Sequence, residues 1–281
     1  MLTNAFQAEQ KTIITVHVVK EDTMPGCARH ENVCGRCDVP LDFEFTMAFQ
    51  PLVNIDEGRV YGYEALVRGS GGESAGSVLA RVDDANLYRF DQACRVKAIE
   101  MAHDLGAEGM LSINFLPNAV YEPQACIQAT LAAARRVGWP TSRLCFEITE
   151  SENVGDRCHL QNIVTSYHEM GMKTALDDFG TGYANLDLLI DISPDVLKID
   201  RQLVSDIQTA PRQQRILEHI ITLARQLDIT LIAEGVEKLE EARWLYRHGI
   251  ARQQGYWFAR PAAGQLPICP ESRFALVRGE H

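Results

Sequence analysis

The chain alternates between short apolar runs and longer stretches in which apolar residues recur every three or four positions. The short runs are rich in β-branched and aromatic residues, which is typical of β-strands. They lie at 46–53, 60–66, 110–115, 143–148, 173–176, 195–199 and 230–233. The first two runs are joined by NIDEGR, whose composition predicts a hairpin loop. We therefore expect about seven or eight strands, one of the early ones antiparallel to its neighbours.

The longer stretches have the period of amphipathic helices. One predicted apolar face consists of Leu87, Phe90, Cys94, Ala98, Met101 and Leu105. A second predicted face consists of Ile216, Ile220, Leu223 and Leu227. A third helix is expected over about 117–137, opening with Pro117, because a missing N–H costs little in a first turn. Four glycines fall where helices should end, namely Gly106, Gly138, Gly171 and Gly249.

Strand–helix units that repeat every 25 to 35 residues or so predict parallel strands joined by crossovers. For this number of strands, a closed barrel fits better than an open sheet. The predicted fold class is α/β, a TIM-like (β/α)8 barrel with one early antiparallel strand. The barrel would occupy 41–281, and 1–40 would form an N-terminal extension with a short strand at 12–19.

Composition narrows the classes of function. The net charge of −11 argues against binding to a long nucleic acid, since such binding needs clustered Lys and Arg. No apolar run approaches the roughly 18 residues of a membrane span. The start of the chain, MLTNAFQAEQK, lacks an apolar signal core, which predicts a cytoplasmic protein. The eight cysteines are then expected to be reduced, with Cys94, Cys126 and Cys145 buried as small apolar residues.

Acidic residues gather at the predicted strands. One amide and five carboxylates lie in or at the end of a strand: Asn114, Glu64, Glu147, Asp177, Asp178 and Glu234. In a parallel barrel these ends meet at one mouth, where such enzymes place their chemistry. Any one of these acids alone would be explained by capping of a helix. The whole set is better explained by Mg²⁺ or Mn²⁺, which would offset the mutual repulsion and suit in-line attack of water on a phosphodiester.

Eight motifs in order and spacing resemble the EAL-domain family of cyclic di-GMP phosphodiesterases. They are FQPLVN (49–54), YGYEALVRG (61–69), SINFLP (112–117), FEITES (146–151), DDFGTGYANLDLL (177–189), DVLKID (195–200), AEGVE (233–237) and QQGYWFARP (253–261). The resemblance covers about 44–262, and its most specific part is DDFGTGY followed by LKID and AEGVE.

The resemblance implies two divalent cations per active site. It implies that the first is held by Glu64, Asn114, Glu147 and Asp177. Asp177 would bridge to the second, with Asp178 beside it and Glu234 serving the metal site and catalysis. No metal-binding position departs from the family's pattern.

The resemblance also implies roles for residues around the metals. Lys198 would position or deprotonate the attacking water, whereas its spacing alone would also allow a salt bridge to Asp200. A lysine acts as a base only if its pKa is lowered, which nearby cations favour. Three further residues would contact substrate, namely Arg68, Gln50 and Gln254; for the two glutamines, hydrogen bonding at strand ends is the simpler alternative.

Glu150 resembles the glutamate that braces the loop after DDFG. In the family this loop links dimerisation to catalysis, so a homodimer is expected. The implied reaction opens one phosphodiester bond of cyclic di-GMP to give linear pGpG, lowering the messenger in bacterial signalling. Two alternatives remain: a catalytically silent receptor for cyclic di-GMP, and a barrel hydrolase acting on another phosphodiester.

A segment outside the resemblance carries four metal-binding side chains within eleven residues, Cys27, His30, Cys34 and Cys37. The CGRC turn resembles a zinc knuckle, which favours tetrahedral zinc. A redox-sensitive centre and unliganded thiols are the alternatives.

Overall fold

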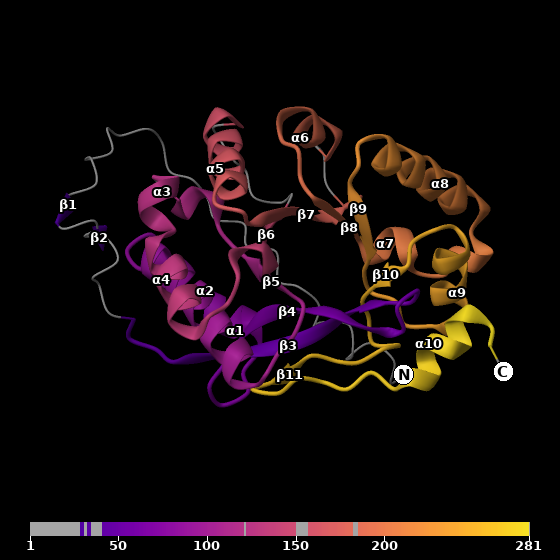
Figure 1. Ribbon diagram of the computed structural model, residues 1–281, viewed down its shortest axis with the longest axis horizontal. Coiled ribbons are helices and arrows are strands. Elements are labelled where there is room, and N and C mark those ends of the chain that lie inside the picture. Colours follow the sequence, from indigo (N-terminus) through magenta and orange to yellow (C-terminus); the bar gives the residue numbers. More distant parts are fainter. Residues whose placement is uncertain are drawn as a thin grey trace, which may run out of the picture.

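Eight strands close into a barrel in the computed structural model, which describes residues 29–30, 33–34, 41–120, 122–149, 157–181 and 185–280 (Figure 1). The strands follow one another around the ring in chain order. They are β3 (Phe45–Asn54), β4 (Arg59–Gly69), β5 (Met110–Asn114), β6 (Leu144–Thr149), β7 (Lys173–Phe179), β8 (Val196–Ile199), β9 (Thr230–Ala233) and β10 (Arg252–Gln253). The predicted fold class is confirmed.

The first barrel strand runs against its neighbours. β3 pairs antiparallel with β4 through the expected hairpin and antiparallel with β10, which closes the ring. The other neighbouring pairs, from β4 to β10, are parallel. A short strand, β11 (Ala262–Ala263), adds to β3 outside the ring, and β1 (Arg29–His30) pairs with β2 (Val33–Cys34) in a separate sheet. The strand predicted at 12–19 lies outside the described residues.

Helices cover most of the outside of the barrel, whereas β11 and coil lie along β3 (Figure 1). The α-helices are α1 (Ala75–Leu79), α2 (Leu87–Asp104), α3 (Pro123–Cys126), α4 (Gln128–Val137), α5 (Arg157–Glu169), α6 (Asn185–Asp191), α7 (Arg201–Val204), α8 (Pro211–Gln226), α9 (Leu239–Arg247) and α10 (Glu271–Arg278). Three 3₁₀ turns are η2 (Pro117–Ala119), η3 (Thr141–Arg143) and η4 (Ile207–Thr209). The four glycines predicted at helix ends all have positive φ, between 69° and 94°.

The single helix predicted over 117–137 is wrong. Pro117 opens only the 3₁₀ turn η2, and the chain then becomes extended at Glu122 (φ −128°, ψ 105°). A residue before proline is restricted to extended conformations, and Pro123 provides that restriction. The helical segment therefore restarts at Pro123 as α3 and continues as α4 after Ile127.

The apolar face predicted for α8 is wrong at its two ends, whereas Ile220 packs partly buried against the core. Ile216 is 45% exposed and Leu227 is 49% exposed, whereas Leu217, Ile221 and Ala224 are buried. Both sets have helical spacing, offset by one residue, so periodicity does not distinguish them. The buried face includes the small side chain of Ala224, so in the sequence it looks less hydrophobic than the predicted face. In α2, by contrast, the predicted members Phe90, Cys94 and Ala98 are buried.

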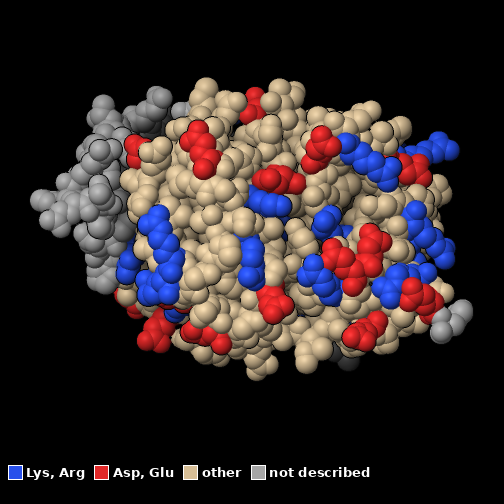
Figure 2. Space-filling view, in the orientation of Figure 1, with Lys and Arg blue, Asp and Glu red and all other residues tan. Residues whose placement is uncertain are grey.

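The surface charges and the cysteines can be compared with the composition of the chain. Figure 2 shows acidic and basic side chains interspersed on one face, with neither sign forming a continuous stripe. Within the ranges that the structure describes, none of the helices has the length and apolar character needed to cross a bilayer. Cys94, Cys126 and Cys145 are buried free thiols, as predicted.

Candidate active site

The predicted acids converge because successive parallel strands each deliver one or two of them to the same mouth of the barrel. Glu64 lies on β4, Glu147 on β6, and Asp177 and Asp178 on β7. Glu234 follows the last residue of β9, and its backbone N–H donates to the carbonyl of Ile199, 3.0 Å away.

Asn114, the last residue of β5, lies between two of these acids. Its Nδ2 donates to Glu64 Oε1 at 3.3 Å and to Glu147 Oε2 at 3.2 Å. Asn114 and Glu147 are paired in the parallel register of β5 and β6, which explains the contact. The amide thus bridges two carboxylates that come from strands on either side of β5.

Two groups of carboxylates share one member. Oxygen atoms of Glu64, Glu147 and Asp177 lie within 4.8 Å of one another, and so do oxygen atoms of Asp177, Asp178 and Glu234. Four of these five residues are buried, Asp178 being half-buried. Two carboxylates about 4 Å apart repel by about 4 kcal/mol at an effective dielectric constant of about 20, so the groups need cations nearby.

The backbone of Asp178 explains how neighbouring residues join one cluster. Consecutive side chains on a regular strand point to opposite faces, which would separate Asp177 from Asp178. Asp178 instead has φ 55°, and the register between β7 and β8 shifts between Leu176 and Phe179. Its N–H donates to Asp177 Oδ1 at 2.9 Å. Left-handed backbone at a non-glycine residue costs of order 1–3 kcal/mol and is concentrated at functional sites.

Lys198 on β8 supplies positive charge at the centre of the cluster. Its Nζ lies 2.7 Å from Glu234 Oε1 and 2.8 Å from Glu147 Oε1. Asp177 Oδ1 and Glu64 Oε2 lie 3.3 and 3.6 Å from the same atom. The alternative pairing with Asp200 is wrong, because Asp200 caps α7 by accepting from the N–H of Gln202 at 2.7 Å.

The cluster shifts the pKa values of its members. Burial, together with the carboxylates of Glu64 and Asp177, raises the pKa of Glu147 well above its ordinary value, although Lys198 opposes the shift. Burial on its own lowers the pKa of Lys198, but its four acidic neighbours outweigh burial and raise that pKa well above the ordinary value. Lys198 is therefore an ammonium in this arrangement. Divalent cations among the same acids would offset their charge and favour a lower pKa.

The donor set fits hard divalent cations. All the converging acidic groups offer oxygen, the ligand type that Mg²⁺, Mn²⁺ and Ca²⁺ prefer, and the described part of the cluster holds neither cysteine nor histidine. Asp177, which belongs to both groups, is placed to serve two ions at once.

The two predicted glutamines lie beside the acids. Gln254 donates through Nε2 to Glu64 Oε2 at 2.7 Å and to Gln50 Oε1 at 3.1 Å, and both glutamines are buried. Gln50 is paired with Glu64 in the register of β3 and β4. Arg68 lies further along β4, is half-buried, and donates through Nη1 to the carbonyl of Val67 at 2.7 Å.

Gly255 follows Gln254 for a steric reason. A Cβ atom at Gly255 would lie 2.0 Å from the carbonyl oxygen of Val236, which real structures do not tolerate. This close approach allows the N–H of Val236 to donate to the carbonyl of Gln254 at 3.0 Å. The segment that carries Gln254 is thereby held against the segment that carries Glu234.

The sequence interpretation missed supporting residues. Glu241 in α9 is buried, and its carboxylate accepts N–H bonds from Glu237 (2.9 Å), Lys238 (3.0 Å) and Asp206 (2.9 Å). It therefore holds the loop that follows Glu234. Only half of the usual signal was available, because a capping box pairs such a glutamate with Ser or Thr three residues earlier, where this chain has Lys238. A buried acid–base pair in α2, Asp91 and Arg95, was also missed.

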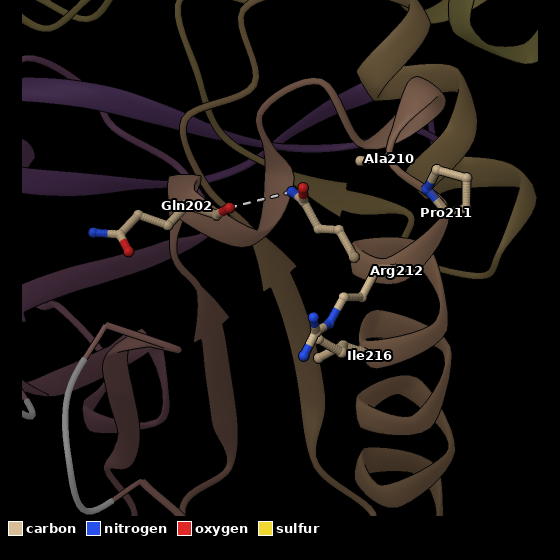
Figure 3. A pocket seen from close by; sticks show the side chains of 6 residues that line it. Gln202, Ala210, Pro211, Arg212 and Ile216 are labelled. Carbon is tan, nitrogen blue, oxygen red and sulfur yellow. Dashed lines mark hydrogen bonds between the residues drawn. The ribbon is translucent and has the colours of Figure 1, made fainter.

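A separate hollow of about 380 Å³ lies between α7 and the start of α8 (Figure 3). One wall is tied to the other by a hydrogen bond from Gln213 Nε2 to the carbonyl of Gln202, 3.2 Å long. The hollow is lined by Gln202, Ala210, Pro211, Arg212, Gln213 and Ile216. None of these is acidic, so this hollow offers no carboxylate to a divalent cation.

Two groups of predicted residues lie outside the described part of the chain. Glu150 and the tip of the loop after DDFG are among them. So are Cys27 and Cys37; His30 and Cys34 fall in β2's sheet, where only the backbone is described.

Known proteins resemble this chain over the barrel. The family model for the EAL domain matches residues 41–261. A crystal structure of a standalone versatile EAL protein from Vibrio cholerae O395 in a c-di-GMP-bound form is 47% identical, with a TM-score of 0.81, over 83% of this chain and 99% of that one. The manganese and cyclic di-GMP complex of Klebsiella pneumoniae BlrP1 is 34% identical, with a TM-score of 0.72, over 78% and 56% of the two chains.

Among curated relatives, the probable cyclic di-GMP phosphodiesterase PdeG of Escherichia coli K12 is 32% identical over 231 residues, which is 78% of this chain and 45% of PdeG. The chain spans 23% to 55% of the length of curated relatives that it matches. In these curated relatives the similarity therefore concerns part of a longer chain, whereas it covers 99% of the standalone Vibrio cholerae protein.

Proposed function

Because the chain belongs to the EAL domain family, we propose that it hydrolyses cyclic di-GMP to linear pGpG with the help of two divalent cations. The proposal depends on one observation: two groups of acidic oxygen donors share Asp177 in the mouth of a barrel. It is supported by a 47% identical protein that binds cyclic di-GMP and by a relative named as a probable phosphodiesterase. Hydrolysis by this chain would lower the messenger in bacterial signalling.

The proposed ligands divide into two sets. The first ion would be held by Glu64, Asn114, Glu147 and Asp177. The second would be held by Asp177, Asp178 and Glu234. When bound, such ions supply positive charge to a phosphodiester and lower the pKa of water. The amide of Asn114 would present its oxygen to the ion, which requires it to exchange its present bonds to two carboxylates.

Lys198 has two proposed roles that depend on charge. As an ammonium it neutralises the acids and can donate a hydrogen bond that orients water. With cations offsetting the acids, its Nζ can instead take the proton of the attacking water. Glu234, 2.7 Å from that atom, is placed to exchange a proton with it. The water oxygen then bonds to phosphorus as one ester P–O bond breaks. The leaving oxygen takes up a proton from solvent, and the ring opens.

Substrate contacts are proposed for three residues. Arg68 offers a guanidinium fork that suits a phosphate. Gln50 and Gln254 are buried next to Glu64 and can order groups of the substrate beside the metals. Glu150 is proposed to brace the loop after DDFG.

Four finer proposals accompany the reaction. The cations are Mg²⁺ or Mn²⁺, which is supported by the oxygen donors and by the manganese complex of a 34% identical protein. A homodimer is supported by α6, where Leu186 is 62% exposed and Ile190 is 81% exposed.

A structural zinc is proposed at Cys27, His30, Cys34 and Cys37. A cytoplasmic location is supported by the free thiols among the described cysteines, and a disulfide in protein isolated from cells would contradict it.

The test is hydrolysis of cyclic di-GMP with Mg²⁺ or Mn²⁺, followed by chromatography. Wild-type protein should form pGpG, and Glu64→Ala should not, because Glu64 belongs to the first metal group and accepts from Asn114 and Gln254. Glu240→Ala is a matched control, since Glu240 is exposed in the first turn of α9. It should retain wild-type activity.

The same assay distinguishes the alternatives. Tight binding of cyclic di-GMP without product from the wild type would indicate a receptor. Cleavage of a linear phosphodiester with none of cyclic di-GMP would indicate a different hydrolase. Product formation at the wild-type rate by Glu64→Ala would contradict the proposed metal site.

A further inference from the structure

A buried ion pair lies outside the acid cluster, on the helix that packs next to β5. Asp91 and Arg95 are one helical turn apart in α2, with 3% and 0% of their surfaces exposed. Asp91 Oδ2 accepts a short hydrogen bond from Arg95 Nη2. Neither residue belongs to the groups that can hold a cation, and the proposed reaction gives neither of them a role.

The second carboxylate oxygen of Asp91 accepts a hydrogen bond from the segment that follows Asn114, a proposed metal ligand. Asp91 Oδ1 accepts from the backbone N–H of Leu116 at 3.0 Å. Leu116 comes two residues after Asn114, where β5 ends and the chain turns into η2. Twenty-five residues separate donor and acceptor in the sequence, so this bond fixes the end of β5 against α2.

Arg95 extends the contact to the neighbouring strand. Its Nη1 donates to the hydroxyl of Tyr167 in α5 at 3.4 Å, and Tyr167 is fully buried. The ring of Tyr167 packs against the ring of Phe146, with centroids 5.0 Å apart, and against that of Phe115, at 5.7 Å.

Phe146 precedes Glu147, and Phe115 follows Asn114. The N–H of Phe115 also donates to the carbonyl of Glu147 at 3.2 Å. Asp91, Arg95 and Tyr167 therefore contact residues next to Asn114 and next to Glu147, the two residues whose side chains are joined by a hydrogen bond.

Stability alone does not explain two charges at this position. Replacing a buried ion pair by apolar residues of similar volume is often neutral or stabilising. The bond to Leu116, in contrast, requires an acceptor at one point, and only a side chain such as that of Asp91 supplies it. Partners that orient metal ligands in this indirect way typically change metal affinity or activity 10–100-fold when they are removed.

We propose that Asp91, held in place by Arg95 and Tyr167, is a positioning residue that fixes the end of β5 so that Asn114 and Glu147 meet the same cation. This inference rests on the proposed function, since it concerns the same metal site. It concerns a residue that touches neither substrate nor metal.

The test compares two double variants of the full chain that differ in one atom group. Asp91→Asn with Arg95→Met keeps a carbonyl oxygen for the N–H of Leu116, whereas Asp91→Leu with Arg95→Met removes it. Both lack the charges, so neither leaves an unpaired ion in the core. Gln92→Met is a control in the same helix, because Gln92 is buried and donates to the carbonyl of Cys126 at 2.7 Å, away from Asn114.

Three measurements separate positioning from general destabilisation. The first is Mn²⁺ affinity by calorimetry without substrate, the second is hydrogen exchange at the amide of Leu116, and the third is the melting temperature. The Leu variant should bind Mn²⁺ about ten-fold more weakly than the Asn variant. Its melting temperature should be lower only by the few degrees that the unpaired N–H of Leu116 costs. It should also exchange the Leu116 amide faster. Gln92→Met should melt lower than wild type and keep wild-type Mn²⁺ affinity.

Equal Mn²⁺ affinity of the two double variants would overturn the inference, as would a loss of affinity in Gln92→Met that matches the Leu variant. Failure of the proposed function is distinguishable. Wild-type protein that binds Mn²⁺ without hydrolysing cyclic di-GMP would overturn the reaction and leave the affinity comparison valid. Wild-type protein that binds no Mn²⁺ would overturn both.

Discussion

At the scale of single residues, the most informative side chain is Lys198. It is fully buried among four carboxylates, and its ammonium partly balances their charge. Divalent cations bound among the same carboxylates would also neutralise part of their negative charge. The state of Lys198 and the occupancy of the metal site should therefore be linked.

Lys198→Met should destabilise the protein much more without divalent cations than with them. Removing one partner of a buried ion pair typically costs about 3–5 kcal/mol, because the remaining charges are left uncompensated. Saturating Mn²⁺ should recover a large part of that free energy of unfolding by neutralising the same acids. Denaturant unfolding with and without Mn²⁺ measures both values.

Lys97→Met provides the comparison for this measurement. Lys97 donates through Nζ to the carbonyl of Phe45 at 2.6 Å and contacts no member of the acid cluster in the described hydrogen bonds and ion pairs. Lys97→Met should lower the free energy of unfolding by the same amount with and without Mn²⁺. If Lys198→Met also loses equal stability in both, the linkage between Lys198 and the cations is refuted.

At the scale of secondary-structure elements, irregularities decide what the site contains. A regular β7 would direct Asp177 and Asp178 to opposite faces, and the positive φ of Asp178 brings both into one cluster. Likewise, the extended residue before Pro123 separates the 3₁₀ turn η2, which follows β5, from the helical segment that starts with α3. Neither feature changes the number of strands, yet the first decides which side chains join the acid cluster.

The orientation of α8 gives a test with two adjacent residues. Leu217→Ala should lower the free energy of unfolding by about 2–5 kcal/mol, since it removes a fully buried side chain and leaves a cavity. Ile216→Ala should change it by no more than about 0.5 kcal/mol, because Ile216 is 45% exposed. Chemical denaturation measures both. Equal losses would show that the helix is rotated from the described orientation.

At the scale of the whole molecule, barrel closure brings distant segments together. Gln254 and Glu64 are separated by 190 residues, and they form a 2.7 Å hydrogen bond because β10 pairs with β3, the partner of β4. The barrel strands begin at Phe45, and the family match begins at residue 41. We therefore expect 41–281 to be the unit that folds and hydrolyses cyclic di-GMP.

Native mass spectrometry of the full chain and of 41–281 tests this division. Both should be dimers, and 41–281 should retain the melting temperature and the hydrolysis rate of the full chain within about two-fold. The full chain should carry one zinc ion that 41–281 lacks, because all four candidate ligands precede residue 41.

The full chain with Cys27→Ser and Cys34→Ser is the control for the zinc, and it should lose the ion and keep its activity. Equal zinc content of all three proteins would refute the zinc site. Monomers throughout would refute the homodimer, and failure of 41–281 to fold would refute the division at residue 41.

Local pattern was enough to predict seven of the eight barrel strands, the antiparallel start of the barrel and the acids at its mouth; β10, only two residues long, was not predicted. These features depend on short-range properties: side-chain period, turn residues, and motifs such as DDFGTGY and AEGVE that lie in one stretch of chain. Glu64, Glu147 and Glu234 were found for that reason, since each lies on or directly after a recognisable strand.

Tertiary structure decided what depends on partners far away in the sequence. The pairing of Lys198 with Glu64 and Glu147 instead of Asp200, the buried face of α8, and the bond between Asp91 and Leu116 all required the closed barrel. The physical reason is that spacing along the chain sets which contacts are locally allowed. Which of them forms is determined by the packing of other elements and by the cost of burying a charge without a partner.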